Sequence, residues 1–187
     1  VAGGHDVRVL VRNPDRIPGS LGALGLEPEV VLGDMTDAGA VGAAVDGCEV
    51  VIHAAAQIGV GGGGPADQAN LDGVRTVVGG ALEAGARRVV YTSSVTAYTP
   101  TEAPVVTLDS PLVEALSPYG ATKVAAEQLL RSWQDDGEPV TIVPGRTVRI
   151  IWSEISTASG IARSGVVKLE SHSSCHAPSA SSQRTPN

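Results

Sequence analysis

Tyr119 and Lys123 are four residues apart in the segment Ser-Pro-Tyr-Gly-Ala-Thr-Lys, and an apolar run that favours a helix follows them. On a helix, residues four apart lie on one face, so the phenol and the ammonium group would be neighbours. A neighbouring lysine favours the phenolate and is expected to lower the pKa of the tyrosine. Such a pair can pass a proton to or from a carbonyl or alcohol oxygen while hydride moves to or from a nicotinamide.

Two serines supply a hydroxyl for the same site. The β-branched and aromatic run 89–91 predicts a short strand, and this strand stops at Ser93 and Ser94. In open α/β sheets, ligands bind at the carboxyl ends of the strands. One of these hydroxyls can therefore hold a substrate oxygen beside the tyrosine.

These segments resemble the extended branch of the short-chain dehydrogenase/reductase superfamily, which includes NAD(P)-dependent epimerase/dehydratase and dihydroflavonol-reductase-like proteins. Thr92-Ser-Ser followed by Val-Thr-Ala-Tyr is similar to the end of the family's fifth strand, and Tyr119-Gly-Ala-Thr-Lys123 is similar to its Tyr-x-x-x-Lys signature. Ser94 and Tyr119 are 25 positions apart, a spacing usual for the family. The resemblance covers residues 1–143. It implies Tyr119 as general acid/base, Lys123 as its activator and a ligand of the nicotinamide ribose, and Ser94 as the group that orients the substrate oxygen.

The resemblance also implies the fold, an α/β protein with a Rossmann-like doubly wound parallel sheet. The sequence pattern predicts strands at 7–12, 29–32, 49–53, 89–91 and 139–143, and helices at 17–24, 37–45, 65–84 and 119–133. The family's sheet begins one strand earlier, so its first strand and the glycine-rich turn should precede residue 1, and the sheet is expected to be incomplete. Without that central strand, its two neighbours would each expose an unpaired edge, and the chain would bind dinucleotide poorly and aggregate.

Two strand ends are expected at the adenosine half of the cofactor. Arg12 ends the first predicted strand, where an arginine suits a ribose 2′-phosphate and favours NADP, with NAD also possible. The alternative is a solvated surface arginine. Gly-Asp34-Met35 ends the next strand and, in the family, lies by the adenine, with the aspartate accepting from the exocyclic amine. Asp34 can also cap the turn that follows, and both can hold.

The segment His53-Ala54-Ala55 ends the third predicted strand, where small residues let the ribose and phosphates of the cofactor approach. His53 could be a base, but in the family this histidine is a common non-catalytic position. Asn70 resembles the asparagine of the family's Asn-x-x-Gly-Thr stretch, and is expected near the active site to hold a helix bend and a water beside Lys123. A surface asparagine is the alternative.

The composition of the chain limits its partners. With 187 residues, 42% hydrophobic and 18% charged, it is typical of one soluble globular domain, and a net charge of −7 argues against nucleic acid or an anionic membrane. Cys48 and Cys175 show neither metal-ligand spacing nor a disulfide framework, which suits the cytoplasm. No apolar run is long enough to span a membrane. We expect a small-molecule carbonyl, alcohol or nucleotide-sugar substrate, no metal, and a possible homodimer through the helix of Tyr119 and its neighbour.

The family pattern is lost after Val143-Pro-Gly-Arg146. Residues 1–145 read as a partial NAD(P)-binding domain, and residues 146–187 as a serine-rich, net positive, divergent tail that is poorly ordered. The missing start and the abrupt loss of pattern suggest a gene fragment with a frame change near Gly145.

The sequence favours an NAD(P)-dependent oxidoreductase, with hydride transfer to or from a carbonyl or alcohol, impaired in this fragment. Arg12 and the segment Asp109-Ser-Pro-Leu before the tyrosine lean towards a carbonyl reductase of the dihydroflavonol-reductase type. The alternatives are a nucleotide-sugar epimerase or dehydratase, a non-catalytic cofactor-binding protein, and an inactive remnant.

Overall fold

The computed structural model describes residues 5–20, 25, 27–57, 65–99, 101 and 110–143. The strands are β1 Arg8–Val11, β2 Glu29–Leu32, β3 Val50–His53, β4 Arg88–Thr92 and β5 Val140–Val143. The helices are α1 Ile17–Ser20, α2 Ala38–Val45, α3 Pro65–Glu83 and α4 Pro118–Asp135, with single 3-10 turns at η1 Pro14–Arg16 and η3 Val95–Ala97.

The predicted elements are confirmed, and their ends agree within two residues except for the helix expected at 17–24, which is described as far as Ser20. The predicted tail and its boundary at Gly145 lie outside the described residues, as does the glycine-rich stretch 59–64.

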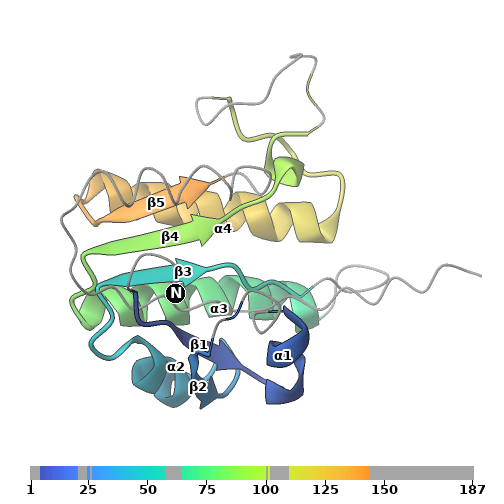
Figure 1. Cartoon of the computed structure of the whole chain (residues 1–187). Helices are drawn as coiled ribbons and strands as arrows, with labels where there is room; N and C mark the ends of the chain where they lie inside the picture. Colours follow the sequence, from blue (N-terminus) through green and yellow to red (C-terminus); the bar gives the residue numbers. More distant parts are fainter. Residues whose placement is uncertain are drawn as a thin grey trace, which may run out of the picture.

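The described strands form two parallel pieces of sheet, β2–β1 and β3–β4–β5. In Figure 1 the strands follow one another in the order β5, β4, β3, β1, β2. Within the described residues, β1 pairs only with β2, and β3 pairs only with β4, so the edges that face each other carry no ladder bonds. In this part of the chain, one edge of β1 and one edge of β3 are therefore without a ladder partner, in line with the expectation from the sequence. Aggregation remains a prediction.

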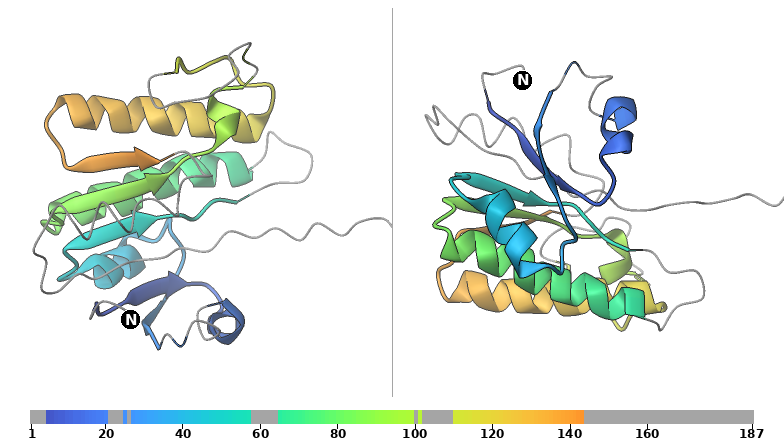
Figure 2. Two further views of the ribbon diagram at one scale, coloured as in Figure 1. Left: turned by 45° about the horizontal axis from the view of Figure 1, so that its top comes forward. Right: turned by 90° about the horizontal axis from the view of Figure 1, so that it is seen from below.

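Three helices cover one side of the strands. Figure 2 shows α2, α3 and α4 side by side on that side, with α1 away from them. Because side chains alternate along a strand, Leu10 of β1 joins the core under these helices, whereas Val9 and Val11 pack with Ile17 of α1. The main core continues through β3, β4 and β5 with buried aliphatic residues: Val51, Val89, Val140 and Ile142.

Helix α2 is fixed at both ends. Asp37 is its N-cap and accepts from the backbone N–H groups of Gly39 and Ala40. At the other end the Arg8 guanidinium donates to the Asp46 carbonyl at 2.6 Å. A Cβ on Gly33 would lie 2.2 Å from Ala40 Cβ, so only glycine lets the helix lie this close to the end of β2.

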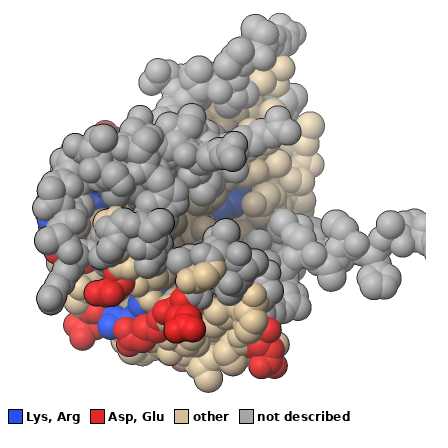
Figure 3. All heavy atoms as spheres, in the orientation of Figure 1, with Lys and Arg blue, Asp and Glu red and all other residues tan. Residues whose placement is uncertain are grey.

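The described surface is acidic in part. In Figure 3, acidic side chains gather over the region that holds α2 and β2. Among the described helices, none combines the length and the apolar character needed to cross a membrane.

Candidate active site

The start of α4 brings Tyr119 to the carboxyl end of β4. Ser117 caps the helix by accepting from the Gly120 N–H at 3.0 Å, and Pro118 occupies the first turn, where its missing N–H costs nothing. A Cβ on Gly120 would lie 3.3 Å from the Thr96 carbonyl oxygen, so the helix packs tightly on the turn after β4. This close packing places Tyr119 beside Ser94.

Ser94 is oriented by its own turn. Its Oγ accepts from the backbone N–H of Thr96 at 3.3 Å and from Thr96 Oγ1 at 3.0 Å, which leaves the Ser94 hydroxyl hydrogen for another partner. That partner is Tyr119. Burial raises the pKa of Tyr119 above its usual value, and the hydrogen bond from Ser94 partly opposes this. The phenol is therefore protonated at neutral pH.

Lys123 is buried, with 4% of its surface exposed. Its Nζ donates to Tyr91 Oη at 3.0 Å and to the Thr92 carbonyl oxygen at 3.1 Å. The same atom lies 4.7 Å from the ring centre of Tyr91 and 5.8 Å from that of Tyr119. Burial lowers the pKa of Lys123 to about 8, and Glu127 opposes the change. The side chain is thus mostly protonated at pH 7.

The expected lowering of the Tyr119 pKa by Lys123 is not found in this structure, where the pKa is raised. The reason is geometric: the ammonium group bonds Tyr91 and Thr92, and the half-buried phenolate loses more through desolvation than it gains. Sequence spacing placed the two side chains on one helical face but could not report how deeply each is buried.

A second polar cluster lies one helical turn further along α4. Glu127 is fully buried, accepts hydrogen bonds from Ser93 Oγ and Tyr98 Oη, and lies 3.4 Å from the Arg131 guanidinium. Burial and the hydrogen bond to Glu127 raise the pKa of Tyr98 to about 12. Ser93 and Ser94 therefore serve different clusters, because their side chains point to Glu127 and Tyr119 respectively.

Glu127, Tyr91 and Tyr98 belong to the site but were not predicted from the sequence. A signal was present, since Tyr119, Lys123 and Glu127 continue the same spacing of four along one helical face. The three tyrosines of the chain, at 91, 98 and 119, all contact this site.

Two residues predicted to bind cofactor are buried. His53 is 1% exposed beside the Tyr91 ring, burial lowers its pKa to about 3, and both ring nitrogens lack a hydrogen-bond partner in the described part of the chain. Met35 is 6% exposed and packs on Gly73, where a Cβ would lie 2.7 Å from Met35 Sδ. Both side chains therefore pack inside the fold in this structure. Ala54 and Ala55 are half-buried at the end of β3.

Asn70 joins α3 to the segment that follows β3. Its Nδ2 donates to the Gln57 carbonyl at 2.8 Å, and its Oδ1 accepts from the Gln57 N–H at 2.6 Å. The contacts found for Asn70 are thus with the backbone that continues from Ala54 and Ala55 rather than with Lys123. The side chain is buried, so the surface alternative is wrong.

Arg12 and Asp34 meet at the ends of β1 and β2. The guanidinium and the carboxylate are 3.5 Å apart, with side chains 47% and 32% exposed. Asp34 also accepts from the N–H and Oγ1 of Thr36, at 3.0 and 2.8 Å, which confirms that it caps this turn. The free faces of both groups remain open to solvent and to a ligand.

The residues predicted to bind a dinucleotide lie at strand ends. Arg12 and Asp34 place a guanidinium and a carboxylate at the ends of β1 and β2, the half-buried Ala54 and Ala55 follow β3, and the Ser94–Tyr119 pair lies at the end of β4. The carboxyl ends of parallel strands are where α/β proteins hold such ligands. No glycine-rich phosphate turn lies within the described ranges. The same ranges hold no group of three metal-ligating side chains.

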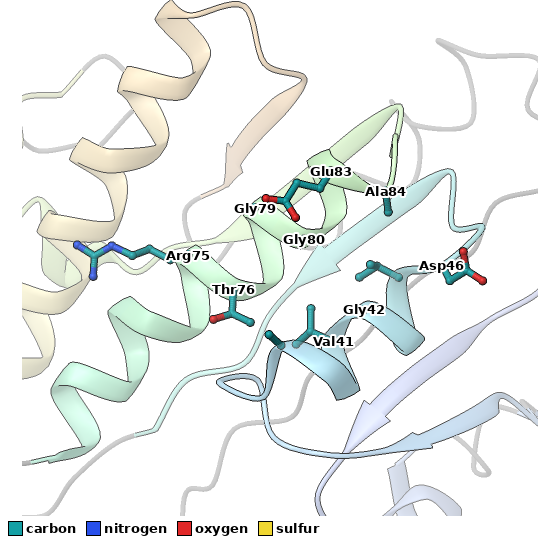
Figure 4. A pocket seen from close by; sticks show the side chains of 11 residues that line it. Val41, Gly42, Asp46, Arg75, Thr76, Gly79, Gly80, Glu83 and Ala84 are labelled. Carbon is teal, nitrogen blue, oxygen red and sulfur yellow. The ribbon is translucent and has the colours of Figure 1, made fainter.

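A groove of about 550 Å³ between α2 and α3 contains none of the predicted site residues. Figure 4 shows the side chains of Val41 and Thr76 at this groove, with glycines 79 and 80 on α3. Small residues on both helices create it.

Comparisons with known proteins show which family the sequence matches. A sequence model of the NAD dependent epimerase/dehydratase family matches residues 2–150. A 3 beta-hydroxysteroid dehydrogenase/Delta 5-->4-isomerase of Mycobacterium tuberculosis is 36% identical over 99 residues, which cover 49% of this chain and 25% of that protein.

Two solved structures are similar as well. A short-chain dehydrogenase/reductase superfamily protein from Agrobacterium tumefaciens, with bound NAD, is 27% identical with a TM-score of 0.56 over 74% of this chain and 48% of that one. DesIV, a dTDP-glucose 4,6-dehydratase from Streptomyces venezuelae with NAD bound, is 27% identical with a TM-score of 0.64 over 75% and 46%. The chain therefore spans half or less of the length of these relatives.

Proposed function

Because this chain belongs to the NAD dependent epimerase/dehydratase family, we propose that it carries the catalytic half of an NAD(P)-dependent oxidoreductase or epimerase/dehydratase. The observation that supports this most is the hydrogen bond between Ser94 and Tyr119 next to the buried ammonium group of Lys123. A proton donor, a hydroxyl and a cation thus meet at the carboxyl end of a parallel strand, where α/β proteins bind ligands.

Tyr119 is the proposed general acid/base. Since burial keeps its phenol protonated, it is ready to donate a proton to a carbonyl oxygen during reduction. Ser94, held by Thr96, donates to the tyrosine oxygen and can turn to a substrate oxygen in the same place. When Tyr119 has given up its proton, the charge of Lys123 stabilises the phenolate. A bound nicotinamide supplies or accepts the hydride.

NADP is the proposed cofactor, because Arg12 projects a partly exposed guanidinium at the end of β1. A planar guanidinium can contact a 2′-phosphate through two hydrogen bonds. The NAD in the two similar crystal structures supports a nicotinamide dinucleotide in general. Arg12→Ala is expected to weaken NADP binding by about 10-fold, a loss of 1–2 kcal/mol, and to leave NAD binding unchanged.

The proposed substrate is a small carbonyl or alcohol compound, with reduction favoured, and the proposed location is the cytoplasm. A nucleotide sugar is the second candidate, supported by the 27% identity with DesIV. A homodimer through α3 and α4 is proposed from the family resemblance alone.

Weak cofactor binding by the 187-residue chain itself is also proposed. Within the described residues, β1 and β3 each leave one edge unpaired, and such edges favour association between chains over a stable cofactor cleft. Cofactor binding by this chain, measured by calorimetry, should be much weaker than binding by the longest polypeptide that its gene encodes. Equal affinity of the two would contradict the impairment.

The reaction is tested in that longest polypeptide. Purified protein is mixed with NADPH or NADH and a panel of ketones, steroid ketones and nucleotide sugars, and the nicotinamide absorbance is followed. Loss of absorbance with a carbonyl compound supports the reductase. Conversion of a nucleotide sugar without net loss of absorbance supports the epimerase or dehydratase. Cofactor binding without turnover of any compound would favour a non-catalytic binding protein. The absence of cofactor binding would favour an inactive remnant.

A further inference from the structure

Glu127 is a buried carboxylate that the proposed reaction does not use. Removing a carboxylate from water is costly unless it is paired and hydrogen-bonded. Here Ser93 and Tyr98 donate to it, and the Arg131 guanidinium lies 3.4 Å away. We therefore asked what a fully buried carboxylate with three polar partners contributes to the site.

The place of Glu127 suggests what that role is. It lies one helical turn beyond Lys123 and two turns beyond Tyr119 on α4. Its partner Ser93 directly precedes Ser94, and Tyr98 is the C-cap of the turn η3 that Ser94 begins. The carboxylate therefore joins the helix that carries Tyr119 to both ends of the turn that carries Ser94.

We propose that Glu127 is a positioning residue, which fixes the Ser94 turn against α4 and keeps Lys123 positively charged. This proposal rests on the proposed function, because it concerns the residues assigned to that reaction. Glu127 itself touches neither a substrate nor the reacting atoms.

The groups around Lys123 support the electrostatic part. Tyr91 faces it from β4, and Tyr119 and Glu127 approach it along α4, while the charge of Lys123 itself acts on His53 of β3. Tyr91, Tyr119 and His53 are neutral at pH 7. Burial raises the pKa of both tyrosines and lowers the pKa of His53 to about 3. Glu127 is the anion that raises the pKa of Lys123.

Arg131 lies on the far side of Glu127 and opposes that effect only in part. It is more exposed than the carboxylate, with side-chain exposures of 40% and 0% respectively. Solvent screens an exposed charge more strongly than a buried one, so the field of Glu127 at Lys123 remains.

The test uses the fact that the chain has two lysines, Lys123 and Lys168. Protein labelled with ¹³C at the lysine ε-carbon gives two signals, and Lys168→Arg leaves the one from Lys123. The pKa of Lys123 is then measured by NMR titration in the otherwise unchanged chain, in Glu127→Gln, and in Glu127→Met. Gln keeps hydrogen-bonding groups, and Met is an apolar residue of similar shape, so the two variants lose the charge by different routes. Glu83→Gln, at an exposed position of α3, is the matched control.

Both uncharged variants should lower the pKa of Lys123 by about 1 or more, since a buried anion one turn away is lost. Glu83→Gln should leave it unchanged. A pKa of Lys123 that is the same in Glu127→Gln or Glu127→Met as in the parent would overturn the electrostatic part.

The positioning part has its own variant, Ser93→Ala combined with Tyr98→Phe, which removes both hydrogen bonds and leaves the carboxylate. Hydrogen exchange of the Gly120 amide at the start of α4 should become about 10-fold faster, as expected for the loss of hydrogen bonds to a charged group. Exchange as slow as in the parent protein would show that these bonds do not hold the helix on the turn.

Failure of the proposed function would look different, because neither NMR readout needs turnover. In the active polypeptide, Glu127→Gln should move the alkaline limb of the pH profile of kcat/KM to lower pH by about the same amount as the pKa of Lys123. If the pKa changes and the profile does not, Lys123 has no part in the reaction. If Tyr119 proves dispensable while the pKa still changes, the proposed function fails and the link between Glu127 and Lys123 stands.

Discussion

Polar side chains are buried in the β3–β4–β5 piece with α4 and exposed in the β1–β2 piece. In the first, His53, Ser93, Lys123 and Glu127 are all nearly inaccessible, and none is more than 4% exposed. In the second, the side chains of Arg12 and Asp34 are 47% and 32% exposed and form a loose ion pair. The two pieces are built from strands of similar length and the same parallel pairing.

This difference separates two kinds of site. The α4 region fixes its geometry by burying polar groups before any ligand arrives, and Ser93, Lys123 and Glu127 among them are hydrogen-bonded. Such an arrangement suits residues that must be aligned for chemistry. The β1–β2 region leaves its charges at the surface, where they are free to contact a ligand and contribute little to folding. The stability of the first region should therefore depend on pH.

The largest expected effect is the loss of folding stability that His53 causes at acidic pH. Its pKa is about 3 in the folded chain and 6.5 in the unfolded chain, so the unfolded chain binds more protons between these values, and the free energy of unfolding falls as pH decreases from 6.5 to 3. The difference of about 3.5 in pKa corresponds to up to about 5 kcal/mol. Urea unfolding from pH 4 to 7 should show much less of this loss in His53→Phe. The control His5→Gln should retain it, and an equal acid loss in His53→Phe would refute the buried neutral imidazole.

Lys123 has an effect of the same sign, but at alkaline pH. Its pKa is about 8 in the folded chain and 10.5 in the unfolded chain, so the unfolded chain binds more protons between pH 8 and 10.5. This group therefore adds stability as pH rises through that window, by about 3 kcal/mol at most. The difference in unfolding free energy between the wild type and Lys123→Met should change accordingly from pH 8 to 10. Lys168→Arg serves as the control, and a constant difference would show that Lys123 is not desolvated.

Substitution of Gly33 tests how closely α2 packs on the end of β2. Gly33→Ala places a Cβ 2.2 Å from Ala40 Cβ, so α2 must shift, and the free energy of unfolding should fall by about 2 kcal/mol. Gly42→Ala on α2 meets no atom within 4 Å and should instead stabilise the helix by about 0.5–1 kcal/mol. Thermal unfolding of the two variants measures the contrast, and equal destabilisation by both would contradict the close approach of α2.

The smallest effect is expected at the exposed pair. Asp34→Asn removes the charge next to Arg12 but keeps an oxygen for Thr36, so stability should change by less than about 0.5 kcal/mol. Chemical unfolding at low and high salt measures this. A loss above about 2 kcal/mol would mean that the β1–β2 region also depends on a tightly held charge.

Local signals were sufficient to predict the elements. Apolar runs predicted all five strands of the described residues, and Asp37 marks the start of α2. The glycines at 85 and 137 follow the ends of α3 and α4 with φ of +81° and +91°, values that other residues rarely adopt. The Ser94–Tyr119 contact was also predictable, because motif spacing in a known family reports a tertiary contact that periodicity alone does not.

The depth of burial could not be predicted. Ser93 and Glu127 are 34 residues apart, and the sequence around each of them does not predict their hydrogen bond. The same holds for Met35, whose place against Gly73 depends on how α3 crosses the strands. Burial then decided the direction of the Tyr119 pKa, which the spacing to Lys123 alone predicted wrongly.

The central claim is that Tyr119 moves the proton of a hydride-transfer reaction in a site built by this chain. The most direct measurement is kcat for Tyr119→Phe in the longest polypeptide that the gene encodes, together with its dissociation constant for the cofactor, and with Ser132→Ala on the same helix as the control. The account predicts a fall in kcat of about 10²–10⁴-fold, an unchanged dissociation constant and an unaffected control. A Tyr119→Phe protein that keeps the turnover of the wild type would contradict it.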